Sequence, residues 1–106
     1  MRAKTSISLF TLLLAVGGFL FADSSLAADP NNGAKIYNIQ CSNCHGPRGQ
    51  GAMPGTPDFS RGQTLFMPDA TLVETIEKGS GVMPAFRGLL STQEILDVIA
   101  YLRTFQ

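Results

Sequence analysis

The sequence contains no tryptophan, one histidine and two cysteines among its 106 residues. A single cysteine pair is too sparse for a secreted domain held together by disulfides. The single histidine, His45, rules out any site that needs two histidines from this chain. Eight basic residues balance eight acidic ones, and no basic stripe is present to neutralise phosphates, so nucleic acid is not expected as a partner.

The first 27 residues are organised like a secretory signal peptide. Arg2 and Lys4 give a positive start, residues 7–21 form an uncharged apolar run, and Ser25-Leu26-Ala27 provides the small residues that signal peptidase reads. The apolar run is shorter than the ~20 residues that a membrane-spanning helix needs. We therefore predict cleavage after Ala27 and a soluble periplasmic domain over residues 28–106. Retention of the segment as an N-terminal anchor is the alternative.

Two helices are predicted, one at the start of this domain and one in its middle. Asp29 followed by Pro30 suits the start of a helix that runs to Gln40. Asp69 is the expected cap of a short helix over residues 70–78, which Gly79 is suited to end.

A third helix is predicted near the C-terminus. Ser91 and Glu94 have the spacing of a capping box. Ile95, Ile99 and Leu102 follow at the spacing of one helix face. No alternating strand pattern is found, so the fold class is all-α, with three or four short helices.

Residues 46–68 form a long segment rich in glycine and proline, in which no long regular element can persist. Such a loop is uncommon in a domain this small unless something holds it. A small domain also buries a limited share of its surface and gains much from a bound group. We therefore expect a cofactor to organise this loop.

The segment Cys41-Ser42-Asn43-Cys44-His45 has the C-x-x-C-H pattern of c-type haem attachment. Two residues between the cysteines let both thiols reach the two vinyl groups on one edge of a porphyrin. The histidine that follows is placed to bind the iron through a neutral imidazole. The pattern therefore predicts one haem c, covalent through Cys41 and Cys44, with His45 as a metal ligand.

Three other kinds of site could use Cys41 and Cys44. A structural zinc site needs four ligands, and these cysteines with His45 supply three. A thioredoxin-like redox pair normally follows a strand, and no strand is predicted before Cys41. A disulfide is geometrically poor for two cysteines so close in sequence. Haem attachment is favoured over all three.

Haem iron in an electron carrier usually takes a second protein ligand, and a methionine thioether is one such ligand. Residues 28–106 contain Met53, Met67 and Met83. Met83 lies in an apolar, glycine-rich segment whose glycines let the backbone pass close to a flat ring, and Pro84 favours extended backbone at Met83. For Met53 and Met67 we expect ordinary apolar packing. On this reasoning alone Met83 is a candidate ligand.

The C-x-x-C-H motif, Met83-Pro84-Ala85-Phe86 and the closing segment Ile99-Ala100-Tyr101-Leu102 together resemble the class I monohaem cytochromes c, in particular the small bacterial and cytochrome c6-like members. The resemblance covers nearly all of residues 28–106. It implies the cytochrome c fold, in which helices wrap around one haem, with His45 and Met83 as axial ligands.

The same resemblance implies roles for a few further residues. Gly33, Tyr37 and Tyr101 match positions where the first and last helices of the family cross. Pro57 matches a loop proline whose carbonyl accepts a hydrogen bond from the histidine ring and so helps to bind the cofactor. The segment between the haem motif and the second helix is short compared with larger members of the family.

We therefore predict an electron carrier, not an enzyme, whose partners are larger redox proteins acting as electron donor and acceptor. Catalysis at the haem would need an open coordination position and nearby acid–base groups. The alternatives are a haem-based ligand sensor and a bound electron-entry subunit of a larger oxidoreductase. The apolar residues expected to keep the haem pocket dry are Ile36, Ile39, Leu65, Leu72, Ile76, Phe86, Ile95, Leu96 and Ile99.

Overall fold

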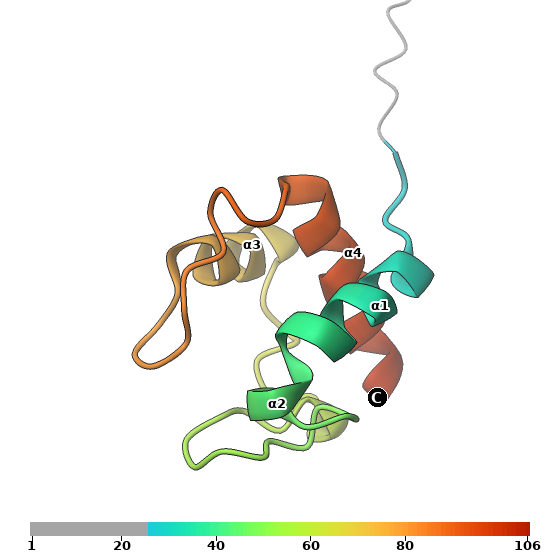
Figure 1. Ribbon diagram of the computed structural model, residues 1–106. Coiled ribbons are helices and arrows are strands. Elements are labelled where there is room, and N and C mark those ends of the chain that lie inside the picture. Colours follow the sequence, from blue (N-terminus) through green and yellow to red (C-terminus); the bar gives the residue numbers. More distant parts are fainter. Residues whose placement is uncertain (1–25) are drawn as a thin grey trace, which may run out of the picture.

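The computed structural model describes residues 26–106, and this part of the chain folds into helices joined by loops (Figure 1). The signal peptide expected over residues 1–27 therefore lies almost entirely outside the described residues. Among residues 26–106, none of the helices has the length and apolar character needed to span a bilayer. The only β-type pairings in this range are two isolated bridges, between Ser80 and Met83 and between Arg87 and Leu90.

The first long helix, α1, spans Pro30–Gln40 and begins as the sequence predicts. The Asp29 side chain accepts a hydrogen bond from the amide of Asn31, and Pro30 occupies the first turn, where a missing N–H costs nothing. A short second helix, α2, spans Ser42–His45 and follows directly. The haem motif therefore lies at the junction of two helices, a detail that apolar spacing did not indicate.

Helix α3 spans Asp69–Lys78 and ends before Gly79, whose φ of 74° suits a glycine. The predicted cap at Asp69 is wrong by one position. The capping position is Pro68, which offers no side-chain hydrogen bond, and Asp69 is the first helical residue. Its carboxylate instead pairs with Arg103 across the fold.

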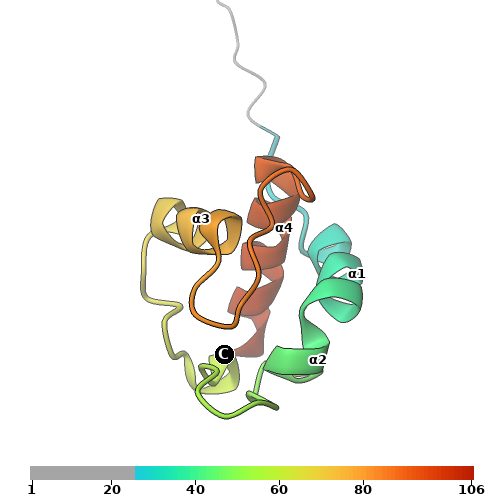
Figure 2. The same cartoon turned by 60° about the vertical axis from the view of Figure 1, so that its left-hand side comes forward.

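Helix α4 spans Thr92–Leu102, and both halves of its predicted capping box are present. The Ser91 hydroxyl accepts from the Glu94 amide, while the Glu94 carboxylate accepts from the Ser91 amide at 2.8 Å. A 3₁₀ turn, η3, continues over Arg103–Phe105. Figures 1 and 2 show α4 between α1 and α3.

The crossing of α1 and α4 uses the residues that the family resemblance indicated. Gly33 lies directly against the α4 backbone at Asp97. The ring of Tyr37 meets Tyr101 edge-on with a centroid distance of 5.5 Å, and it meets Phe105 in the same way. This contact brings the two ends of the domain together.

Apolar side chains form two clusters, one on each side of a central cavity. Tyr37, Phe59, Leu65, Val98 and Leu102 make the first cluster. Leu72, Ile95 and Ile99 make the second. Of the residues expected in the dry interior, Ile39 is wrongly placed, because its side chain is 74% exposed on the outer face of α1.

Local hydrogen bonds and one distant side chain hold the long segment over residues 46–68. It contains a 3₁₀ turn, η2, over Phe59–Arg61, and the Phe59 amide donates to the Gly49 carbonyl at 2.7 Å. The Arg103 guanidinium donates to the carbonyls of Leu65 and Met67. These hydrogen bonds connect the end of this segment to the turn that follows α4.

Candidate functional site

A cavity of about 600 Å³ lies between the two apolar clusters, within the size range of pockets that bind cofactors. It is lined from α1, α2, α3 and α4 and from the loops over residues 53–67 and 80–90. Most of its wall is apolar, and none of the lining side chains is an aspartate, glutamate, lysine or arginine. The cavity therefore suits a large, flat and mainly apolar group.

Cys41 and Cys44 line this cavity from one side, at the end of α1 and in α2. The amides of Cys44 and His45 both donate to the carbonyl of Cys41, at 3.2 and 3.0 Å, so one helical turn contains the whole motif. Gly46 follows with a φ of 84° and ends the turn.

The thiol of Cys41 does not have the character of a redox-active cysteine. Burial is the main cause that raises its pKa to about 11, and the neighbouring Cys44 adds to the rise. Reactive thiols in redox pairs need a lowered pKa instead. Both thiols are free in the described chain, as they must be before they can form bonds to another group.

The imidazole of His45 lines the cavity and stacks on the ring of Phe59, with a centroid distance of 4.9 Å and an interplanar angle of 21°. Burial lowers the pKa of His45, which favours the neutral ring that a metal ligand requires. Its Nδ1 atom is buried and has no hydrogen-bond partner.

The expected hydrogen bond from His45 to the carbonyl of Pro57 is therefore absent. Pro57 lines the cavity, as the family resemblance implied, but it does not satisfy the buried Nδ1 atom. Phe59 stacks on one face of the imidazole, whereas the Nδ1 atom lies at the edge of the ring and is left without a partner. The contact with Phe59 was not predicted from the sequence.

Met83 enters the cavity from a tight loop that closes on itself. The amides of Ser80 and Met83 each donate to the other's carbonyl, at 3.1 and 2.9 Å. Gly79 is required at the base of this loop, because a Cβ there would lie 2.6 Å from the Met83 carbonyl oxygen. The Phe86 amide then donates to the Ile76 carbonyl and fastens the loop to α3.

Met53 and Met67 also line the cavity. Met53 is 41% exposed and Met67 packs against the cluster of Leu72, Ile95 and Ile99. The expectation of ordinary packing therefore fits Met67 better than Met53. Position in the cavity does not separate the three methionines, whereas only Met83 is presented by a loop closed through paired backbone hydrogen bonds.

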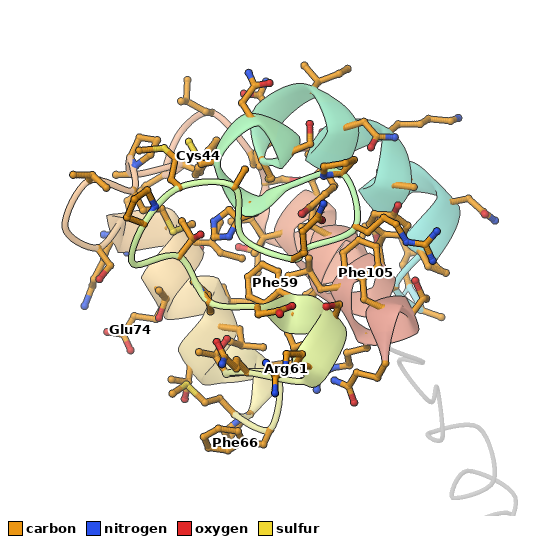
Figure 3. All side chains as sticks on the ribbon, turned by 90° about the horizontal axis from the view of Figure 1, so that it is seen from below. Cys44, Phe59, Arg61, Phe66, Glu74 and Phe105 are labelled. Carbon is orange, nitrogen blue, oxygen red and sulfur yellow. The ribbon has the colours of Figure 1, made fainter. Side chains whose placement is uncertain are left out.

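These residues fit a c-type haem on grounds of chemistry. Two thiols, an imidazole with a buried nitrogen that has no partner, and a thioether all line one apolar cavity. Cys44 and Phe59 are labelled in Figure 3. Thiols, imidazole and thioether are the groups that attach haem c and bind its iron.

Comparison with known proteins gives the same picture. The family model described as "Cytochrome C oxidase, cbb3-type, subunit III" matches residues 28–102. The chain is 32% identical over 102 residues to cytochrome c6 of Nostoc sp. (strain PCC 7120), with 92% of this chain and 90% of that protein covered. It is 36% identical over 85 residues to the cbb3-type oxidase subunit CcoP of Azospirillum brasilense, with 74% and 29% covered.

A solved structure supports the fold. Cytochrome c6 from the diatom Phaeodactylum tricornutum superposes with a TM-score of 0.62 at 29% identity, covering 73% of this chain and 93% of the other. The relatives therefore agree with the all-α fold over almost the whole described chain.

Proposed function

The chain belongs to the class I monohaem cytochromes c, and we propose that it is an exported carrier that moves single electrons between larger redox proteins. The observation that carries this proposal is the convergence of Cys41, Cys44, His45 and Met83 on one apolar cavity. Their side chains are the two thiols, the imidazole and the thioether that a six-coordinate haem c requires.

Each of these four side chains is assigned a role. The thiols of Cys41 and Cys44 would attach the haem covalently through its two vinyl groups, each as a thioether, with no oxidant consumed. His45 and Met83 would bind its iron. When bound, the haem iron supplies a one-electron couple whose potential depends on these ligands and their surroundings.

The remaining cavity residues keep water and acid–base chemistry away from the iron. Leu65 and Ile95 are almost fully buried, and Leu72 is 8% exposed. Because no charged side chain lines the cavity, a general acid or base would have to come from elsewhere. This environment supports a carrier in place of an enzyme.

Periplasmic location is part of the proposal. Its support is the signal-peptide pattern of residues 1–27, together with the fact that covalent haem attachment takes place outside the cytoplasm. N-terminal sequencing of protein from its native host should give Ala28 as the first residue. An intact Met1 on a membrane-bound form would contradict both processing and the expected location.

The experiment that tests the function is a visible spectrum in both redox states, with and without carbon monoxide. Protein made with a c-type maturation system should keep its haem after extraction with acidified acetone. Its reduced form should not bind carbon monoxide at neutral pH, because both axial positions are filled. Avid binding at neutral pH would instead indicate a haem-based sensor.

A second candidate function is an electron-entry subunit of a larger oxidoreductase. It is favoured by the matching family description and by the 36% identity to the subunit CcoP, of which this chain covers 29%. The two functions separate on purification from the native host. A carrier should be recovered from the periplasmic fraction as a single chain. A bound subunit should instead copurify with its partner in stoichiometric amount.

A further inference from the structure

Thr64 has a backbone conformation that does not suit its side chain. Its φ is 64°, and it is the only residue other than glycine in the described range with a positive φ. For a β-branched residue this is a genuine outlier, because the branched Cβ crowds the neighbouring backbone. An outlier of this kind raises the question of what the strain achieves.

The position of Thr64 in its turn also disfavours a threonine. The Leu65 amide donates to the Gly62 carbonyl at 3.2 Å, which makes residues 62–65 a four-residue turn with Thr64 third. A positive φ at the third position normally selects glycine or asparagine. Glycine would adopt this turn without strain, so local turn chemistry does not account for a threonine.

The surroundings of Thr64 impose the conformation. The next residue, Leu65, is 1% exposed and is part of the core cluster around Tyr37. The Arg103 guanidinium donates to the carbonyls of Leu65 and Met67 and fixes the chain just after Thr64. On the other side, the Gln63 side chain accepts from the Asp58 amide at 2.8 Å.

Thr64 lines the cavity with hydrogen-bonding groups to spare. Within residues 26–106, neither its hydroxyl nor its amide forms a hydrogen bond. Two other threonines on the cavity wall, Thr56 and Thr75, donate their hydroxyls to backbone carbonyls, at 2.7 and 2.9 Å. Thr64 therefore differs from them in having two free donors next to the cavity.

The haem of the proposed function brings a specific need for such donors. It carries two propionate carboxylates on the edge opposite its vinyl groups, and the cavity wall has no lysine or arginine. Buried carboxylates need hydrogen-bond donors. The donors that the chain offers on the cavity wall are neutral groups.

Thr64 lies on the correct side of the cavity. The thiols of Cys41 and Cys44 would hold the vinyl edge beside α2. In Figure 2 the segment over residues 62–68 lies on the left of the fold, whereas α2 lies on the right. Figure 3 shows Cys44 and Phe66, two residues beyond Thr64, on opposite sides of the molecule. A haem attached through Cys41 and Cys44 would direct its carboxylate edge away from α2, toward the side of the fold on which residues 62–68 lie.

We propose that Thr64 is held in its strained conformation so that its hydroxyl and amide donate hydrogen bonds to a haem propionate. Thr64 is then a positioning residue for the haem. The inference rests on the proposed function, because it needs a haem attached through Cys41 and Cys44.

The test compares two substitutions at Thr64 in the intact holoprotein, one without and one with a hydroxyl. Thr64→Val keeps the shape and the β-branch but removes the hydroxyl, whereas Thr64→Ser keeps the hydroxyl. Resonance Raman spectra of the reduced protein report the propionate bending modes directly. We expect Thr64→Val to shift one of these bands and Thr64→Ser to leave both at the wild-type position.

Thr75→Val is the matched control, because it removes a cavity-lining hydroxyl that is already bonded within α3. It should leave the propionate bands unchanged. A wild-type spectrum for Thr64→Val would overturn the proposal, and so would an equal shift in Thr64→Ser or in Thr75→Val.

A second pair of variants covers the case in which Thr64→Val accumulates poorly. Glycine and asparagine both tolerate a positive φ, but only asparagine carries a side-chain donor. Thr64→Gly should shift the same band as Thr64→Val, while Thr64→Asn should shift it less. An unchanged band in Thr64→Gly would overturn the proposal.

Wild-type protein without covalent haem would overturn both this inference and the proposed function. Normal covalent haem with unchanged propionate bands in Thr64→Gly would contradict this inference alone.

Discussion

Gly33 of α1 and Asp97 of α4 lie in backbone contact: a Cβ atom on Gly33 would stand 1.9 Å from the carbonyl oxygen of Asp97. Real Cβ atoms do not approach other atoms so closely, and the neighbours within 3 Å are all backbone atoms of α4. The two helices can cross at this distance only because residue 33 has no side chain.

Gly33→Ala should therefore destabilise the protein although alanine is the better helix former. The clash cannot be relieved by rotating a side chain, so we expect a loss of about 3 kcal/mol, the upper end of typical overpacking costs. Chemical denaturation of the holoprotein measures it. Asn38→Ala, an exposed site in the same helix, should be neutral or slightly stabilising. Equal stabilities for the two variants would contradict the close crossing.

Asp97 is the one buried acidic side chain of the described residues, and it predicts a pH dependence of stability. Desolvation by burial tends to raise its pKa, but hydrogen bonds from Asn32, the Asp29 amide and Gln93 outweigh this effect and lower the pKa below its ordinary value. The stabilisation is therefore complete above the ordinary pKa of an aspartate. It is lost as the pH falls through the lower pKa of the folded state.

Asp97→Asn tests this relationship, because an amide cannot accept all three hydrogen bonds. We expect a loss of about 1–3 kcal/mol at pH 7, and a smaller difference from wild type at an acid pH below the ordinary pKa of an aspartate, where the stabilisation by the charged carboxylate declines. Denaturation at both pH values gives the comparison. Glu74→Gln changes an exposed carboxylate of α3 and should have little effect at either pH. A pH-independent penalty in Asp97→Asn would show that the charge is not what matters.

Tyr37 gives the corresponding prediction at alkaline pH. Its hydroxyl donates to the Gly46 carbonyl at 2.6 Å, directly after the haem motif. Burial is the main cause that raises its pKa to about 12, followed by the neighbouring Cys41 and Tyr101. Because this pKa lies above the unfolded value, the stabilisation is present below about pH 10 and lost as the pH rises through about 12.

Tyr37→Phe should cost about 1–3 kcal/mol at neutral pH, since the Gly46 carbonyl loses its donor. It should also remove the share of the alkaline loss that comes from Tyr37. Denaturation at pH 7, 10 and 12 measures both effects. Tyr101→Phe is the control, because its ring also lies in the helix crossing while Tyr37 keeps its hydrogen bond. The assignment fails if Tyr101→Phe alters the alkaline profile as strongly as Tyr37→Phe.

The ligand assignment leads to a prediction on the three methionines of the cavity. Met83→Ala should abolish the weak red absorption band of a thioether bound to ferric iron, lower the reduction potential and open the iron to carbon monoxide. Met53→Ala and Met67→Ala should keep all three properties, with packing losses of at most about 2–5 kcal/mol where the side chain is buried. If another variant loses the band while Met83→Ala keeps it, the ligand is not Met83, although the carrier function stands.

Signals that act within one turn of the chain predict the local structure correctly. The Asp29 cap, the capping box of Ser91 and Glu94, and the apolar stripe of α4 depend on neighbours at most a few residues away. The error at Asp69 has a tertiary cause, because its carboxylate is drawn to Arg103, which lies far away in the sequence. Ile39 is exposed for a similar reason, since apolar character does not say whether another segment covers a helix face.

The sequence by itself determined the chemistry of this protein, because the attachment of haem depends on residue types at fixed short spacings: two thiols separated by two residues, and an imidazole directly after them. Only the tertiary structure decided which groups surround that chemistry. It placed Phe59 against the imidazole in place of a Pro57 hydrogen bond, buried Asp97 beneath the start of α1, and forced Thr64 into a positive φ beside the cavity. These relationships join residues from different elements, and the packing of those elements sets them.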